Sequence, residues 1–435
     1  MTGSRLGSRL WWGLVPLVAL LWAVGAFSAD LLPGVTVPPL LTQVAVPMVA
    51  YARDIALALT AGALLTVLLA PSNRIRRWAL GWGVTALGLA VVALLALRAD
   101  VTATQLLVSD DALIPILRDT AVGRASLFQV GAFVVAAVLM SLPWFTRYRW
   151  LPGIALGAVL VGIAALPIAG HAGVTSQHAV AGIATGVHAA AVLLWIGGLA
   201  AVSSACLLET DRAAVLLPRF SSIAFACVVI AAETGLLSAS LIVGALGDLL
   251  GSSYGSLVVA KGVLLAWLIR LGWVQRRSAI DRLPDRSVPA TVARMAGIEF
   301  LAMGAALAAS VVLVRLGPPP LPGTGFAPLT LVALGIGVPL VGLQIWPGGW
   351  RRANALPEAA MMVFLLVVIE VGGVGLLRAA LGPSGLLVEL AVLLLAGWLA
   401  VAASRFSVGA TWIGILGLPI AMGINLWLGD AISWR

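Results

Sequence analysis

The sequence predicts an all-α, polytopic membrane protein with about thirteen transmembrane helices. Hydrophobic residues make up 61% of its 435 residues and charged residues only 10%, whereas a soluble domain has roughly 25% charged residues. Apolar runs of about 20 residues recur along nearly the whole chain, and a helix needs about that many to cross a bilayer. A membrane barrel would instead alternate apolar and polar residues in segments of about ten. The composition therefore excludes a soluble globular protein and favours a helical bundle in lipid.

The expected spans are apolar windows bounded by Arg, Pro, Gly and acidic residues. They lie near residues 10–28, 50–70, 78–97, 125–144, 150–170, 184–205, 220–241, 255–275, 293–313, 326–346, 357–377, 384–404 and 408–428.

The placement of Arg predicts an amino terminus inside the cell and a carboxyl terminus outside. With this orientation, 17 of the 26 basic residues fall in inner connections: Arg5, Arg9, Arg74, Arg76, Arg77, Arg147, Arg149, Arg212, Arg219, Arg276, Arg277, Arg282, Arg286, Arg294, Arg351, Arg352 and Arg405. The net charge of +9 is therefore a topology signal spread over short loops. It does not indicate nucleic-acid binding.

Three regions follow from this layout. Residues 1–44 hold the first span and an outer loop. This span fits either a signal anchor or a cleaved signal peptide, and cleavage would leave twelve spans. The Pro-rich segment 317–323, GPPPLPG, predicts a boundary. We therefore expect a main transmembrane domain over 45–320 and a four-helix extension of unknown role over 321–435.

The chain has three histidines, His171, His178 and His188, all within eighteen residues. The span positions place all three at the outer face. Neutral imidazole is the commonest side-chain ligand of copper, zinc and haem iron, so the cluster predicts a metal or haem site. On one straight helix His178 and His188 would be about 15 Å apart, so a shared ion requires the segment near His178 to fold back. The alternative is that these side chains only bind loop carbonyls at the interface.

Two weaker candidate ligands, Met48 and Asp54, lie at the start of the second span, at the same expected depth as the histidines. A thioether suits Cu(I), and a carboxylate suits Cu(II) or another cation. Each is also compatible with a structural role.

Ionisable residues inside the spans predict one ion pair. Lys261, the only lysine, is expected at a depth similar to that of Glu233 in the preceding span, and pairing lowers the cost of charges in lipid. Glu299, Glu370 and Glu389 also fall inside spans and make a cation pathway conceivable without establishing one.

Small residues predict close packing between the fifth and sixth spans. The relevant glycines are Gly153 with Gly157, Gly182 with Gly186, and the pair Gly197-Gly198.

The segment GHAGVTSQHAVAGIATGVHAAAVLLWIGGLAAV, from Gly170, resembles the copper resistance protein D family. The family's hallmark is a GHA-type turn followed by a helix of the form H-x-x-A-x-x-x-W-x-G-G-L. The likeness extends over about residues 45–320 and continues through Arg219-Phe220-Ser221, Thr234-Gly235, Tyr254-Gly255, Lys261, Arg276-Arg277, Glu299 and Pro318.

The resemblance implies a multi-pass protein of the bacterial cytoplasmic membrane, surrounded by lipid, that transports or delivers copper. It also implies an extracytoplasmic copper-binding partner. Of the candidate copper ligands, His171 and His188 match the family motif, whereas His178 is a candidate from the histidine cluster alone. Some family members carry a fused cytochrome oxidase assembly domain, but the last 115 residues here contain no His, so that domain's motifs are absent. The rival hypothesis is a redox protein in which His171 and His188 bind haem b. No nucleotide-binding or hydrolase motif is present, and we do not expect an enzyme.

Overall fold

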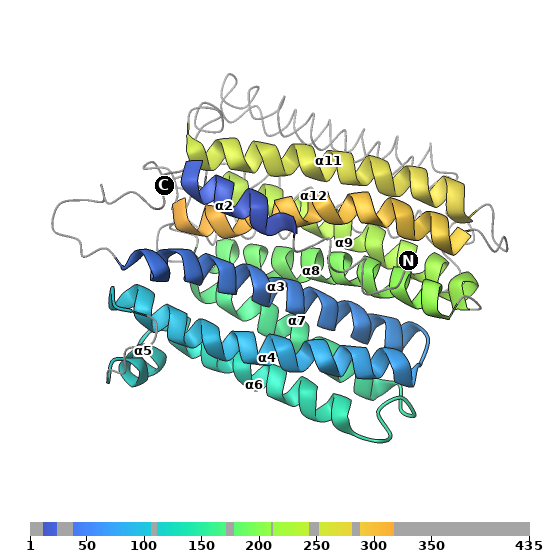
Figure 1. Cartoon of the computed structure of the whole chain (residues 1–435), viewed down its shortest axis with the longest axis horizontal. Coiled ribbons are helices and arrows are strands. Elements are labelled where there is room, and N and C mark those ends of the chain that lie inside the picture. Colours follow the sequence, from blue (N-terminus) through green and yellow to red (C-terminus); the bar gives the residue numbers. More distant parts are fainter. Residues whose placement is uncertain are drawn as a thin grey trace, which may run out of the picture.

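The computed structural model describes residues 12–23, 38–105, 111–170, 178–209, 212–242, 252–280 and 288–316. Every regular element in these ranges is a helix (Figure 1). Eight of the described helices are long and apolar enough to cross a membrane. They confirm a helical membrane protein and match the eight expected spans between residues 50 and 313. The total of thirteen spans stays a prediction, because residues 317–435 lie outside the described part.

The eight long helices are α3 (Leu40–Leu69), α4 (Asn73–Val101), α6 (Ala121–Ser141), α7 (Trp150–Gly170), α8 (His178–Leu208), α9 (Ala213–Ile242), α11 (Ser253–Ile280) and α12 (Val288–Leu316). Two short helices, α2 (Leu14–Ala23) and α5 (Leu113–Asp119), accompany them. The helix α2 lies within the first expected span, and α5 was not expected. Helices α3 and α8 begin ten and six residues before their expected spans, because Pro47 and Gly182, residue types that usually bound a span, lie inside these helices.

The described bundle has two chemically different ends. We call one the basic end: α3, α6 and α8 finish there, and α4, α7 and α9 begin there, close to Arg76, Arg147, Arg212 and Arg219. We call the other the histidine end, where α8 begins at His178 and α5 lies (Figure 1). The loops expected to face the cytoplasm therefore share one end. Which side of the membrane this end faces remains a prediction.

Helices α3 and α8 form the centre of the described bundle. Helix α3 packs against α4, α7, α8 and α12, and α8 also packs against α7, α9 and α12. In Figure 1, α3 runs between α4 on one side and α2 with α12 on the other. Burial follows this arrangement: the apolar window is 72% buried in α3 and 78% in α8, but only 22% in α4. The two central helices are therefore shielded from lipid by the others.

Glycines bring the backbones of α3 and α8 into direct contact. A Cβ atom on Gly197 would overlap the carbonyl of Ala58, and one on Gly62 would overlap the carbonyl of Gly197. On the next face of α8, Gly198 lies against the ring of Phe220 in α9. Without a hydrophobic force between helices in lipid, such close packing of small residues is a main source of association.

The expected packing of the fifth and sixth spans is confirmed at one of the three glycine sets. Gly182 and Gly186 of α8 lie against the α7 residues Ile168 and Ala164. The prediction is wrong for Gly153 and Gly157, which have no described atom near the position of a Cβ. It is also wrong for the pair Gly197-Gly198, which packs on α3 and α9. Sequence shows that a glycine permits contact but not which helix will occupy the space.

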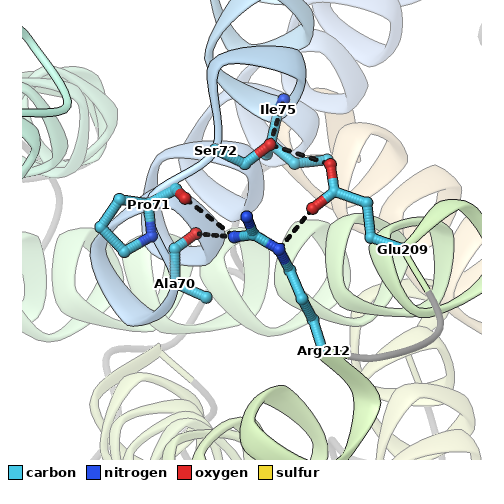
Figure 2. Close-up of polar contacts among 6 residues, drawn as sticks. All are labelled: Ala70, Pro71, Ser72, Ile75, Glu209 and Arg212. Atoms are coloured by element: carbon cyan, nitrogen blue, oxygen red, sulfur yellow. Dashed lines mark hydrogen bonds and ion pairs between the residues drawn. The ribbon is translucent and has the colours of Figure 1, made fainter.

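At the basic end, hydrogen bonds from an ion pair in the α8–α9 turn join it to the α3–α4 turn (Figure 2). Arg212 Nε lies 2.6 Å from Glu209 Oε2, and Arg212 Nη1 donates to the carbonyls of Pro71 at 2.8 Å and Ala70 at 3.3 Å. Ser72 Oγ donates to Glu209 Oε1 at 3.0 Å. One arginine and one glutamate thus hold together two turns that are far apart in sequence.

Two more arginines bind the carboxyl ends of helices. Arg219 donates to the carbonyl of Leu69 at 2.8 Å, and Arg76 donates to the carbonyls of Met140 at 3.0 Å and Leu142 at 3.2 Å. The last carbonyls of a helix have no partner inside it and carry partial negative charge, so cations are favourable there. The arginines that signal topology also stabilise helix ends.

We expect Gly197→Ala to destabilise the bundle by about 1–3 kcal/mol or more, because the added methyl group meets backbone that cannot rotate away. The matched control is Gly157→Ala in α7, where no described atom is near. Alanine there should be neutral or stabilise the helix by about 0.5–1 kcal/mol. Thermal unfolding of the purified protein in detergent measures both variants. Equal stability of the two variants would contradict the backbone contact.

We expect Arg212→Gln to lower stability by about 1–3 kcal/mol, because it leaves the partly buried Glu209 without its cation. Arg77→Gln is the matched control, since Arg77 is exposed at the same end and has no described partner. The same unfolding assay should show little change for this control. A loss of equal size in both variants would indicate a general effect of charge and would argue against the specific ion pair.

Candidate metal-binding site at the histidine end

His188 is held in a defined orientation by α9. Its Nδ1 atom lies 2.8 Å from the backbone carbonyl of Ala231. A carbonyl oxygen can only accept, so Nδ1 carries the hydrogen in this contact and Nε2 of the neutral ring keeps its lone pair. In the part of the chain that the structure describes, no hydrogen bond to Nε2 is found. The ring therefore has the tautomer that suits binding of a metal through Nε2.

The local sequence of α9 explains why the imidazole fits there. Thr234 donates its hydroxyl to the carbonyl of Ile230 in its own helix and places its oxygen 3.4 Å from His188 Nδ1. Gly235 leaves space, because a Cβ atom there would lie 3.1 Å from His188 Cε1 and 3.2 Å from Nδ1. A carbonyl has two lone pairs, so Ala231 can accept from the histidine and still take part in its helix.

A cation lies near this histidine. The charge of Lys261 of α11 acts electrostatically on His188. Lys261 is the only lysine of the chain, and His188 is the only histidine whose side chain the structure describes. The expected partner of Lys261 is Glu233, whose side chain lies outside the described part. The ion pair of Glu233 with Lys261 therefore stays a prediction.

The contact of α3 with α8 shows how far Met48 and Asp54 lie from His188 along the length of the bundle. Gly197 lies level with Ala58, and both helices run from the histidine end to the basic end. His188 precedes Gly197 by nine residues, or about 13.5 Å, and Met48 precedes Ala58 by ten residues, or about 15 Å. Met48 is thus level with His188, whereas Asp54 lies about 7.5 Å closer to the basic end.

Asp54 has a partner that the sequence reasoning missed. Arg53 Nη2 lies 2.9 Å from Asp54 Oδ1, and Arg53 Nε lies 3.1 Å from the same oxygen. A metal ion at Asp54 would have to compete with this arginine. The signal was present in the sequence, as an Arg directly before an Asp inside an apolar helix.

The other two histidines are only partly described. His171 lies outside the described residues, and His178 is the first residue of α8, with its side chain outside the described part. Because α8 is one helix from His178 onward, the backbones of His178 and His188 are about 15 Å apart. Within the described ranges, no three His, Cys, Asp or Glu side chains are close enough to share an ion. The complete ligand set is therefore a matter of proposal.

Together, these features define a helical membrane protein with an oriented imidazole about 15 Å along α8 from the histidine end. Residues 214–313 of the chain match the family model of copper resistance protein D. No curated protein and no solved structure matches the chain. The family match confirms the expected resemblance over this segment and supports a copper resistance membrane protein.

The matched segment includes nearly all of α9, the helix that contacts His188. Ala231, Thr234 and Gly235, which contact the ring, and Lys261 and Glu299 all lie between residues 214 and 313. The motif at 171–199 lies outside it. The family pattern therefore covers the residues that orient the imidazole, while the imidazole itself is supplied by the neighbouring α8.

Proposed function

We propose that this protein handles copper at the bacterial cytoplasmic membrane, by uptake into the cell or by delivery to copper enzymes. The observation that carries the proposal is the contact of His188 Nδ1 with the Ala231 carbonyl. Histidines that bind metals commonly donate their second ring hydrogen to a carbonyl or carboxylate, which fixes the ring and makes it a better ligand. The match to copper resistance protein D supports copper as the metal.

His171 and His188 are the main ligands in this proposal. They belong to the two elements that most resemble the family motif, and both are expected at the histidine end. His178 joins the same ion only after the first turn of α8 unwinds, since the helix separates it from His188. Met48, level with His188, offers a thioether for Cu(I), whereas Asp54 is the weaker candidate because Arg53 holds it.

The orientation follows from the arginines. We propose that the basic end faces the cytoplasm, in agreement with the positive-inside rule, and that the histidine end faces outward. An extracytoplasmic copper-binding protein is then the expected partner, because it would meet the histidines first. The haem hypothesis gains no support from the structure or from the family match. Its test is included in the experiment below.

Copper binding tests the site. We expect His188→Ala to abolish most copper binding by the purified full-length protein, and Gly235→Ala to weaken it, because the added methyl group crowds the ring. Gly262→Ala in α11, with no described atom nearby, is the matched control and should bind as the wild type does. Affinity should also fall as the pH is lowered, since a proton competes with copper for the imidazole.

Metal analysis and an optical spectrum of the same samples separate the two hypotheses. Bound copper without a Soret band supports the copper site. A Soret band that disappears in His188→Ala would instead establish the haem hypothesis. Wild-type copper binding by a folded His188→Ala variant would remove this histidine from the site.

Reporter fusions test the orientation. Fusions after Arg77 and Arg277 should report the cytoplasm, and fusions after Asp111 and Pro320 should report the outside. The reason is that alternate connections of consecutive spans lie on opposite sides. An inverted reporter within this series would contradict the proposed topology.

A further inference from the structure

Glu299 is a buried acid near the middle of α12. The residue is 3% exposed, and it lies eleven residues from the start of the helix at Val288. Its Oε1 atom is buried without a hydrogen-bond partner. Among the described residues, neither a hydrogen bond nor an ion pair to its carboxyl group is found.

Three other described carboxylates in or beside the long helices are held by arginines. Asp54 pairs with Arg53 at 2.9 Å, Glu209 with Arg212 at 2.6 Å, and Asp100 with Arg315 at 3.1 Å. All three are more exposed than Glu299. Glu299, the most deeply buried of the described acids, thus has no cation partner among the described residues.

Glu299 lies on α12 away from the residue of this helix that contacts α3. Gly304, five residues further along, accepts a hydrogen bond from Tyr51 of α3 at 3.3 Å and also faces Gly13. Five residues turn the helix by about 140° and advance it by about 7.5 Å. Glu299 therefore lies on a different face of α12 from the Tyr51 contact, and nearer to the basic end. Helix α12 also packs against α8 and α11.

No described charge is paired with Glu299. Helix α2 contributes no titratable group within its described residues. The described titratable and charged side chains on the other helices packed against α12, and on α12 itself, are Tyr51, Arg53 and Asp54 of α3, His188 and Cys206 of α8 with Glu209 just after it, Tyr254, Lys261 and Arg270 of α11, and Arg315. None of them forms a described ion pair or hydrogen bond with Glu299. The side chains of His178, Arg276, Arg277 and Arg294, on the same helices, lie outside the described part. An isolated carboxylate is very unfavourable in an apolar interior, and the usual remedy without a partner is to bind a proton.

We propose that Glu299 is a proton-binding site, and that its proton leaves when copper enters the bundle from the histidine end. This inference rests on the proposed copper function. A cation in a low-dielectric interior needs a compensating negative charge. Breaking the O–H bond of the Glu299 carboxyl group supplies one carboxylate and releases one proton to water. Entry of one Cu(I) and loss of one proton leave the net charge of the interior unchanged, without any redox step.

Infrared spectroscopy of the full-length protein in membranes tests the proton site without copper. The wild type should show a carbonyl band of a protonated carboxyl group that disappears as the pH is raised. Glu299→Gln should lack this band, and Glu299→Asp should shift it. Glu209→Gln, which removes an acid already paired with Arg212, is the matched control and should keep it. Identical carboxyl bands in the wild type and both Glu299 variants would overturn the proposal.

Copper titration of proteoliposomes containing a pH-sensitive dye tests the coupling. The wild type should release one proton more for each Cu(I) bound than Glu299→Gln releases. Equal proton release, with copper bound by both proteins, would overturn the coupling. If the wild type binds no copper, the proposed copper function fails, whereas the infrared result still decides whether Glu299 binds a proton.

Discussion

The backbone contact between α3 and α8 is the interaction on which the rest of the described bundle depends. Gly62 and Gly197 let the two helices touch without intervening side chains. The same helix α8 then holds α7 through Gly182 and Gly186, and it holds α9 through Gly198 and Phe220. His188 therefore lies on the most constrained helix of the bundle. A ligand on such a helix keeps its geometry, which a metal site requires.

Charged and polar side chains in this apolar bundle find partners in three ways. At the basic end, Arg76, Arg212 and Arg219 bind backbone carbonyls at helix ends. Along α3, Arg53 and Asp54 neutralise each other. At the histidine end, a backbone carbonyl orients His188. Glu299 follows none of these patterns, and for this reason it is the natural place for an exchangeable charge.

Hydropathy alone predicted the fold class and eight consecutive helices, because lipid demands long apolar segments whose backbone bonds are satisfied internally. It could not predict that α3 begins at Leu40, since Pro47, a residue type that usually bounds a helix, lies inside this one. Nor could it show that Gly197 meets α3, because a glycine carries no information about its neighbour. The orientation of His188 was hidden for a related reason. Its partner is the carbonyl of Ala231, and every residue has a backbone carbonyl.

The central claim is that copper binds at the histidine end through an imidazole nitrogen of His188. X-ray absorption spectroscopy of the copper-loaded, full-length protein tests it most directly, because the spectrum distinguishes imidazole nitrogen from sulfur ligands. The expected result is imidazole nitrogen around copper in the wild type and a reduced imidazole signal in His188→Ala. A copper site with sulfur ligands alone, or an identical spectrum in the two proteins, would contradict the claim.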